Sequence, residues 1–179
     1  MRLHLTVATG LLAIVSLCGS PALAQQVTKE TVPGIRNLAR IETTVACAGA
    51  ITPESVVEVK KMGFVSIVNL RLATEEGADV EKEAAAAKAA GIRYFHVPYD
   101  GSADPKAADA FLTAITTKGA EPAFIHCAGG NRAATMWFIK RLVVDRWELG
   151  KATEEATLLG MSSPVMKKFA TEYAESHKR

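Results

Sequence analysis

The side chains best suited to chemistry stand together between Cys127 and Arg132. A short apolar run at 122–125 predicts a buried strand before them, and the apolar run after Arg132 predicts a helix. Because the loop between them contains a Gly-Gly pair, its backbone N–H groups and the positive end of the helix dipole favour a bound oxyanion. The same field favours a thiolate over a thiol. These residues predict a cysteine nucleophile acting on an anionic group; the simpler alternative is a buried structural cysteine beside a turn.

The first 24 residues have the pattern of a secretory signal peptide. Arg2 is followed by an apolar run at 5–17, which is too short to span a bilayer in the usual way. A Pro-Ala-Leu-Ala sequence then ends at Ala24 and supplies a small-x-small cleavage site. We expect a periplasmic or secreted mature protein with no stable membrane insertion after cleavage; an uncleaved anchor is the alternative.

The composition argues against nucleic acids, metals and cofactors as partners. Apart from Arg2, the chain has 20 basic and 19 acidic residues, so its balance gives no argument for a nucleic acid. Aromatic residues make up only 6%, which disfavours a base-stacking surface. The histidines and cysteines lack the spacing of metal ligands, and we expect neither a metal nor a cofactor.

Two cysteines remain after the predicted cleavage, Cys47 and Cys127. In an oxidising compartment they could form a reversible disulfide that switches the nucleophile off. Equally, Cys127 could be a free reactive thiol with Cys47 buried nearby. The sequence leaves this open, because a disulfide depends on the separation of the two Cα atoms.

The mature chain alternates predicted strands and helices. We expect a flexible segment at 25–35 and one domain at 36–176. Predicted strands cover 64–70, 92–97 and 122–126, with one or two short strands within 37–48. Predicted helices cover 52–62, 79–90, 104–118, 133–147, 153–159 and 164–175. Gly150 is expected to end the long apolar helix, and the charged residues of 81–88 to form a solvated helix face.

This alternation implies parallel strands joined by right-handed crossovers, and hence an α/β fold with a central, mostly parallel sheet flanked by helices. In such sheets, ligands bind beyond the carboxyl ends of the strands. Arg71, Asp100 and Cys127 all follow predicted strands. Topology therefore places the three at one edge of the fold, independently of the cysteine loop.

Several segments together resemble a known superfamily. They are the Thr-Pro-Glu helix start at 52–54, the segment 63–71 ending in Asn-Leu-Arg, the segment 89–98 ending in His-Val-Pro, and the His126-Cys127 loop. From about residue 36 to 173, the chain resembles the cysteine-based protein tyrosine and dual-specificity phosphatases. It looks most like the small bacterial phosphatase-like family that also occurs fused to β-lactamase-fold hydrolases. The resemblance implies a dual-specificity-phosphatase-like fold.

The resemblance also implies a two-step phosphoryl transfer on a phosphorylated or other oxyanionic substrate. Cys127 would attack phosphorus as a thiolate, and Arg132 would clamp two oxygens as a planar fork. The loop residues would bind the remaining oxygens (Ala128, Gly129, Gly130 and Asn131). Asp100 stands where the family's general acid tends to lie, although an ordinary turn residue is the alternative. Asp104 is a second candidate, but it precedes Pro105 as a helix cap would.

Two further residues are candidates for the binding site. His126 could tune Cys127, or it could only satisfy a backbone carbonyl at the end of its strand. Arg71 could line the anion pocket, or it could form a salt bridge to Glu75 or Glu76.

The loop departs from the phosphatase pattern at two points. Four residues separate Cys127 from Arg132 where the family has five, and Ala133 replaces the usual Ser or Thr. A Cys-x-x-Gly-x-Arg loop is similar to that of rhodanese-type sulfurtransferases, which carry sulfur as a cysteine persulfide. The leading prediction is a phosphatase acting on phosphotyrosine, phosphoserine or a small phosphomonoester. The alternatives are a sulfurtransferase using a Cys127 persulfide and a non-catalytic domain that binds oxyanions.

Overall fold

A computed structural model describes residues 26–177, so the predicted signal peptide lies outside the described residues. Within 26–177, six strands form one sheet in the order β1-β2-β3-β6-β4-β5. The strands are β1 (Thr28–Val32), β2 (Ile35–Ile41), β3 (Val45–Ala48), β4 (Ser66–Asn69), β5 (Arg93–His96) and β6 (Ala123–His126). The helices are α1 (Val56–Lys61, after the 3₁₀ turn Pro53–Ser55), α2 (Val80–Ala90), α3 (Pro105–Thr116), α4 (Asn131–Val143), α5 (Leu149–Leu158) and α6 (Pro164–Ser176).

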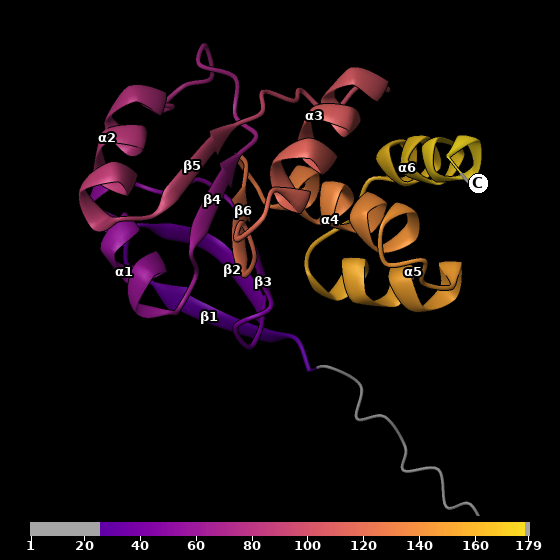
Figure 1. The fold of residues 1–179 in the computed structure, drawn as a ribbon, viewed down its shortest axis with the longest axis horizontal. Helices are drawn as coiled ribbons and strands as arrows, with labels where there is room; N and C mark the ends of the chain where they lie inside the picture. The colour runs from indigo at the N-terminus through magenta and orange to yellow at the C-terminus, as the bar shows by residue number, and fades with distance from the viewer. Residues whose placement is uncertain (1–25, 178–179) are drawn as a thin grey trace, which may run out of the picture.

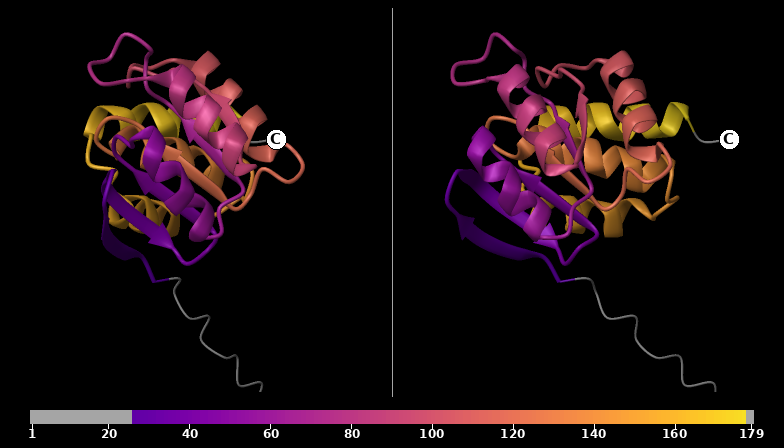
Figure 2. Two further views of the ribbon diagram at one scale, coloured as in Figure 1. Left: turned by 90° about the vertical axis from the view of Figure 1, so that its left-hand side faces the viewer. Right: turned by 60° about the vertical axis from the view of Figure 1, so that its left-hand side comes forward.

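The parallel half of the sheet confirms the predicted α/β fold. Strands β3, β6, β4 and β5 pair in parallel in that spatial order, and along the chain helices connect β3 to β4, β4 to β5 and β5 to β6. Helices α1 and α2 cover one face, whereas α3, α4, α5 and α6 lie on the other (Figures 1 and 2). No helix within the described range is long and apolar enough to cross a membrane.

The prediction of a flexible segment at 25–35 is wrong for most of its length. Strand β1 pairs antiparallel with β2, which in turn pairs antiparallel with β3. A tight turn at Gly34, with φ of 76°, reverses the chain between β1 and β2. Arg40 donates to Glu30 across the two strands at 2.6 Å. Because cross-strand pairing supplies these partners, a short polar sequence becomes an edge strand and the domain begins before residue 36.

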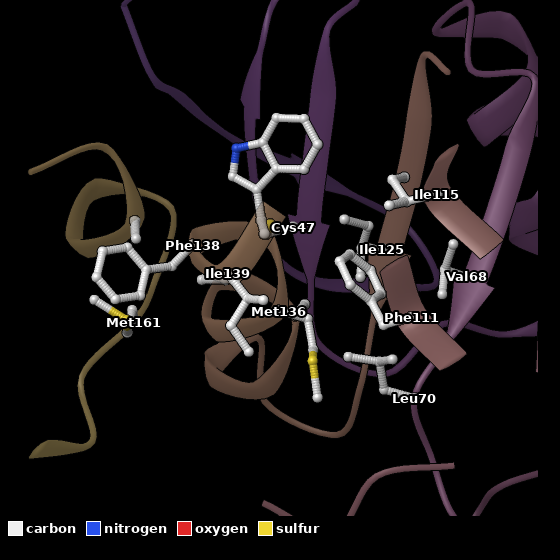
Figure 3. Packing of buried hydrophobic residues seen from close by; sticks show 14 of the residues in the cluster. Cys47, Val68, Leu70, Phe111, Ile115, Ile125, Met136, Phe138, Ile139 and Met161 are labelled. Atoms are coloured by element: carbon white, nitrogen blue, oxygen red, sulfur yellow. The ribbon is translucent and has the colours of Figure 1, made fainter. Parts of the chain in front are cut away.

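Two apolar clusters fill the space between the sheet and its helices. The larger lies under α3 to α6 and contains Cys47, Ile125 and Cys127; the smaller lies under α1 and α2 and contains Phe124. Figure 3 shows part of the larger cluster, with side chains from β3, β4, β6, α3 and α4. Helix α4 is buried almost throughout, so the segment after the cysteine loop is fixed by packing on the sheet.

The boundaries around α4 and α5 differ from those predicted. Helix α4 ends at Val143, because Arg146 adopts a left-handed φ of 57° and Trp147 N donates back to the carbonyl of Arg141. Helix α5 starts at Leu149, so Gly150 lies in its first turn and is not a stop signal. Helix propensity is a weak guide to where these helices begin and end, because tertiary contacts determine the boundaries.

Candidate active site

The loop after β6 carries the cysteine and is closed by a glycine conformation. Cys127 N donates to the carbonyl of Ala48 on β3 at 3.2 Å, which places the residue at the carboxyl end of the sheet. Gly130 has a left-handed φ of 104°, which side chains disfavour. Its N–H donates to Cys127 Sγ at 3.1 Å. An N–H aimed at sulfur stabilises negative charge on it, as a thiolate nucleophile requires.

Strand β2 and the segment that follows β3 hold the outer side of this loop. Ala50 N donates to the carbonyl of Ala128, and Asn37 Nδ2 donates to the carbonyl of Gly129, both at 3.0 Å. Across a trans peptide, the N–H points opposite to the carbonyl. The Gly129 N–H therefore points away from Ala50, and the Gly130 N–H donates to Cys127 Sγ.

The first turn of α4 begins immediately after the loop. Its N–H groups have no partner from within the helix, and the helix dipole adds positive potential there. Asn131 Oδ1 accepts from the backbone N–H of Ser162 at 2.8 Å and of Ser163 at 3.3 Å. Its side chain therefore ties the loop to the connection between α5 and α6.

Arg132 is held by a carboxylate along one edge of its guanidinium. Its Nη1 lies 2.6 Å from Glu75 Oε1, and its Nη2 lies 2.9 Å from Glu75 Oε2. Nη1 also donates to the carbonyl of Tyr99 at 2.5 Å. These bonds occupy the Nη1–Nη2 edge and leave the Nε–H and the second Nη2 hydrogen for a bidentate anion. The hydrogen bond from Arg132 lowers the pKa of Glu75 to about 2, so this carboxylate stays ionised and is no proton donor at neutral pH.

The cysteine loop opens into a pocket of about 400 Å³. Its walls are largely apolar apart from the charged groups, and its lining residues are Leu72, Glu75, Asp100, Cys127, Ala128, Gly129, Asn131, Arg132 and Met166. The structure therefore brings the three predicted catalytic residues to one pocket. Cys127 lies at its base, since its exposed fraction is only 1%.

The candidate acid stands at the exposed rim of this pocket. Asp100 accepts from the backbone N–H of Ser102 at 2.8 Å, and the hydrogen bonds from Ser102 lower the pKa of Asp100. The second candidate, Asp104, caps α3 by accepting from Lys106 N at 2.9 Å, as its position before Pro105 suggests.

Of the predicted binding residues, Gly130 does not line the pocket although its N–H donates to Cys127 Sγ, and two others lie away from the pocket. His126 is fully buried on the opposite face of the sheet, because side chains alternate along β6, and its Nε2 lies 2.7 Å from Glu83 Oε1. The Arg71 guanidinium contacts Glu75 Oε2 at 3.2 Å and donates to the carbonyls of Glu76 and Gly77. Arg71 thus shapes the loop that carries Glu75 and does not line the pocket itself.

A family model described as "Beta-lactamase hydrolase-like protein, phosphatase-like domain" matches residues 37–143. The chain belongs to this phosphatase-like family. Among curated relatives, the beta-lactamase hydrolase-like protein of Agrobacterium fabrum is 34% identical over 105 residues, which is 56% of this chain and 24% of that protein. Its Xylella fastidiosa counterpart is 33% identical over 112 residues, 59% of this chain and 25% of that protein. The phosphatase-like chain spans about a quarter of the length of these relatives.

Solved structures share the fold. A putative phosphatase from Shewanella putrefaciens superposes with a TM-score of 0.67 at 19% identity, covering 82% of this chain and 96% of that one. The P. aeruginosa protein TpbA superposes with a TM-score of 0.61 at 22% identity, covering 89% of this chain and 92% of that one. The phosphatase-like domain therefore has the architecture of cysteine-based phosphatases.

Five residues that shape the site were not predicted from the sequence. Leu72, Glu75 and Met166 line the pocket, and Asn37 anchors the loop from β2. Glu83 was expected on a solvated face, which is wrong: its exposed fraction is 4%, and it contacts His126. The signal for Glu83 was its spacing of four from Ala87, since both lie on the buried side of α2.

Both cysteines of the phosphatase-like domain are buried free thiols. Cys47 pairs in register with Ile125, two residues before Cys127. Burial raises the pKa of the Cys47 thiol well above its ordinary value, and the nearby Cys127 raises it further. Cys47 is therefore a protonated core residue at neutral pH. Within residues 26–177, no group of His, Cys, Asp and Glu side chains is arranged to hold a metal ion.

Proposed function

We propose that the domain hydrolyses phosphomonoesters through a cysteinyl-phosphate on Cys127. The proposal rests chiefly on the pocket that Cys127, Arg132 and Asp100 share, in which the Gly130 N–H donates to Cys127 Sγ. The family match and the fold shared with cysteine-based phosphatases agree with it.

Binding would place the phosphoryl group over the loop. The open Nε–Nη2 edge of Arg132 would take two oxygens, and the amides of the loop and of the first turn of α4 would take the others. Because Glu75 already holds the guanidinium, the fork needs little reorganisation when the anion arrives.

The chemistry would proceed in two displacements. Cys127 Sγ attacks phosphorus, the bond from phosphorus to the ester oxygen breaks, and Asp100 gives its proton to that oxygen. Water then attacks the cysteinyl-phosphate while Asp100 takes a proton from it, so inorganic phosphate leaves and the thiolate returns. The pKa of Asp100 is low in the free domain, and a bound phosphate ester would raise it by adding negative charge nearby.

The substrate would be a phosphorylated protein side chain or a small phosphomonoester. TpbA, which shares the fold, has been solved in complex with pTyr. We propose that this domain acts outside the cytoplasm, in the periplasm or after secretion, because its first 24 residues have the pattern of a cleaved signal peptide.

Loop length favours a second candidate, a sulfurtransferase. Four residues separate Cys127 from Arg132, as in the rhodanese-like pattern. Cys127 thiolate would take the outer sulfur of thiosulfate and release sulfite, and cyanide would then remove that sulfur as thiocyanate. A loop that binds the anion without reacting is the remaining alternative.

A paired assay on the purified protein separates the three functions. We expect hydrolysis of para-nitrophenyl phosphate, its abolition in Cys127→Ser, and a loss of about 100-fold in kcat/KM in Arg132→Lys, which keeps the charge but removes the fork. Cys47→Ala is the matched control, because it removes a thiol outside the pocket, and it should retain hydrolysis. Thiocyanate formation from thiosulfate and cyanide without phosphate release would favour the sulfurtransferase. Phosphate binding with neither activity would leave only the binding function.

A further inference from the structure

A buried polar pair lies directly behind the reactive loop. Glu83 on α2 and His126 at the end of β6 have exposed fractions of 4% and 0%, and His126 Nε2 lies 2.7 Å from Glu83 Oε1. The other ring nitrogen, Nδ1, is buried and has no partner among the described residues. Glu83 therefore provides the hydrogen bond that sets the orientation of the His126 ring.

The polar contacts behind the sheet continue from this pair to the neighbouring strands. Tyr94 on β5 accepts a hydrogen bond from Asn69 Nδ2 at 2.8 Å, and Asn69 Oδ1 accepts from Arg71 N at 2.7 Å. Burial and the charge of Glu83 both raise the pKa of Tyr94, so its phenol stays neutral near the carboxylate. Arg71 lies at the start of the loop that carries Glu75.

These polar contacts connect to both catalytic groups, Cys127 and Arg132. His126 precedes Cys127 by one peptide bond, and its carbonyl accepts from Leu70 N at 2.9 Å. Leu70 O in turn lies 3.4 Å from Arg132 Nη1. Rotation of the His126–Cys127 peptide would therefore move the Cys127 thiol and would also disturb the hydrogen bond between Leu70 N and the His126 carbonyl. Nucleophilic attack is sensitive to displacements of about 1 Å.

We propose that Glu83 is a positioning residue for the reactive loop. It fixes the His126 ring on the far face of the sheet, and through the His126–Cys127 peptide it aligns Sγ with the fork of Arg132. The effect on turnover rests on the proposed function, whereas the effect on loop geometry does not.

Two substitutions of Glu83 on α2 distinguish the effect of its hydrogen bond to His126 from the effect of its negative charge. Glu83→Ala removes the bond, and Glu83→Gln keeps an oxygen that can accept from Nε2–H. Glu81→Ala is the matched control, since Glu81 is an exposed glutamate on the same helix. For para-nitrophenyl phosphate, we expect kcat to fall at least tenfold in Glu83→Ala with KM changed less than threefold. Glu83→Gln should restore kcat to within threefold of the wild type, and the control should match the wild type.

Two results would overturn the proposal. One is wild-type kcat in folded Glu83→Ala; the other is a Glu83→Gln variant as slow as Glu83→Ala, which would assign the role to charge. If Glu83→Ala does not fold, Glu83→Asp provides the test, because a shorter carboxylate pulls the ring out of place. A folded Glu83→Asp should lose at least fivefold in kcat, and an unchanged kcat would refute the proposal.

An amide spectrum tests the geometry without requiring turnover. In ¹H–¹⁵N spectra, the Gly129 and Gly130 resonances should shift in Glu83→Ala and stay in place in Glu81→Ala. Shifted loop resonances in a protein that hydrolyses nothing would retain the positioning role and reject the phosphatase. Unshifted resonances would reject the positioning role even if hydrolysis is found.

Discussion

Glu75 can act on Arg132 in two opposite ways, and removing it distinguishes them. As an orienting partner, it holds the Nη1–Nη2 edge and presents the opposite edge to substrate. As a competitor, its carboxylate would hold the guanidinium away from the anion. The two bonds at 2.6 and 2.9 Å leave Nε free, which favours the orienting role.

The expected loss in Glu75→Ala follows from these two contacts. Hydrogen bonds to charged groups contribute about 1.5–3 kcal/mol each. The Glu75 side chain is 21% exposed, so water replaces part of what is lost, and the bond from Arg132 to the Tyr99 carbonyl remains. We expect about 1.4–2.8 kcal/mol less transition-state stabilisation, which is about 10- to 100-fold in kcat/KM.

Steady-state hydrolysis of para-nitrophenyl phosphate and calorimetric titration with inorganic phosphate measure the effect. Glu76→Gln is the matched control, because the exposed Glu76 contributes only its backbone carbonyl to Arg71. Tighter phosphate binding or faster hydrolysis in Glu75→Ala would refute the orienting role and identify Glu75 as a competitor.

The same contact predicts a pH dependence of stability. The pKa of Glu75 is about 2 in the folded state and about 4.3 in an unfolded chain. A depressed folded pKa stabilises the fold above about pH 4.3, and this contribution disappears as the pH falls towards 2. The difference in melting temperature between wild type and Glu75→Gln should therefore be full at pH 6 and should shrink between pH 4 and pH 2. A melting-temperature difference that stays constant between pH 4 and pH 2 would contradict a depressed pKa for Glu75.

Three further substitutions test the other groups of the site. Asp100→Asn should lower kcat about 100-fold for phenyl phosphate but much less for para-nitrophenyl phosphate, whose leaving group needs no proton; equal losses on the two esters would exclude Asp100 as the acid. Gly130→Ala should destabilise the domain by about 1–2 kcal/mol in thermal melts, because its φ of 104° disfavours a side chain, and should weaken phosphate binding; an unchanged melt would show that the loop relaxes. Asn37→Gly removes the bond to the Gly129 carbonyl and tolerates the φ of 50°, so kcat/KM should fall about fivefold for a contact of about 1 kcal/mol, and unchanged kinetics would show that the other anchors hold the loop without Asn37.

The parts of the fold that depend on local signals could be predicted from the sequence. Asp104 before Pro105 marks the start of α3, and Asp79 caps α2. The alternation of strands and helices was sufficient to predict a mostly parallel sheet, because parallel strands require crossovers. Topology alone also placed Asp100 near Cys127, since both follow strands at the same edge.

Features that depend on distant partners could not be predicted in this way. The sequence 28–32 becomes β1 only through pairing with β2, and its polar composition alone favours a loop. Glu75 meets Arg132 across 57 positions, and Glu83 meets His126 across 43. The spacing of Glu83 from Ala87 indicates a buried position but does not identify His126 as its partner, and the sequence suggested Glu75 only as a partner of Arg71. His126 was placed in the site by its adjacency to Cys127, whereas strand alternation sends its side chain to the other face.

In the proposed reaction, Cys127 carries the phosphoryl group during turnover. Wild-type protein mixed with para-nitrophenyl phosphate, quenched in acid within one turnover and digested, tests it by mass spectrometry of the peptide that contains Cys127. We expect a peptide heavier by one phosphoryl group from the wild type, and no such peptide from Cys127→Ser. Phosphate release from wild type without the adduct, or continued release from Cys127→Ser, would contradict it.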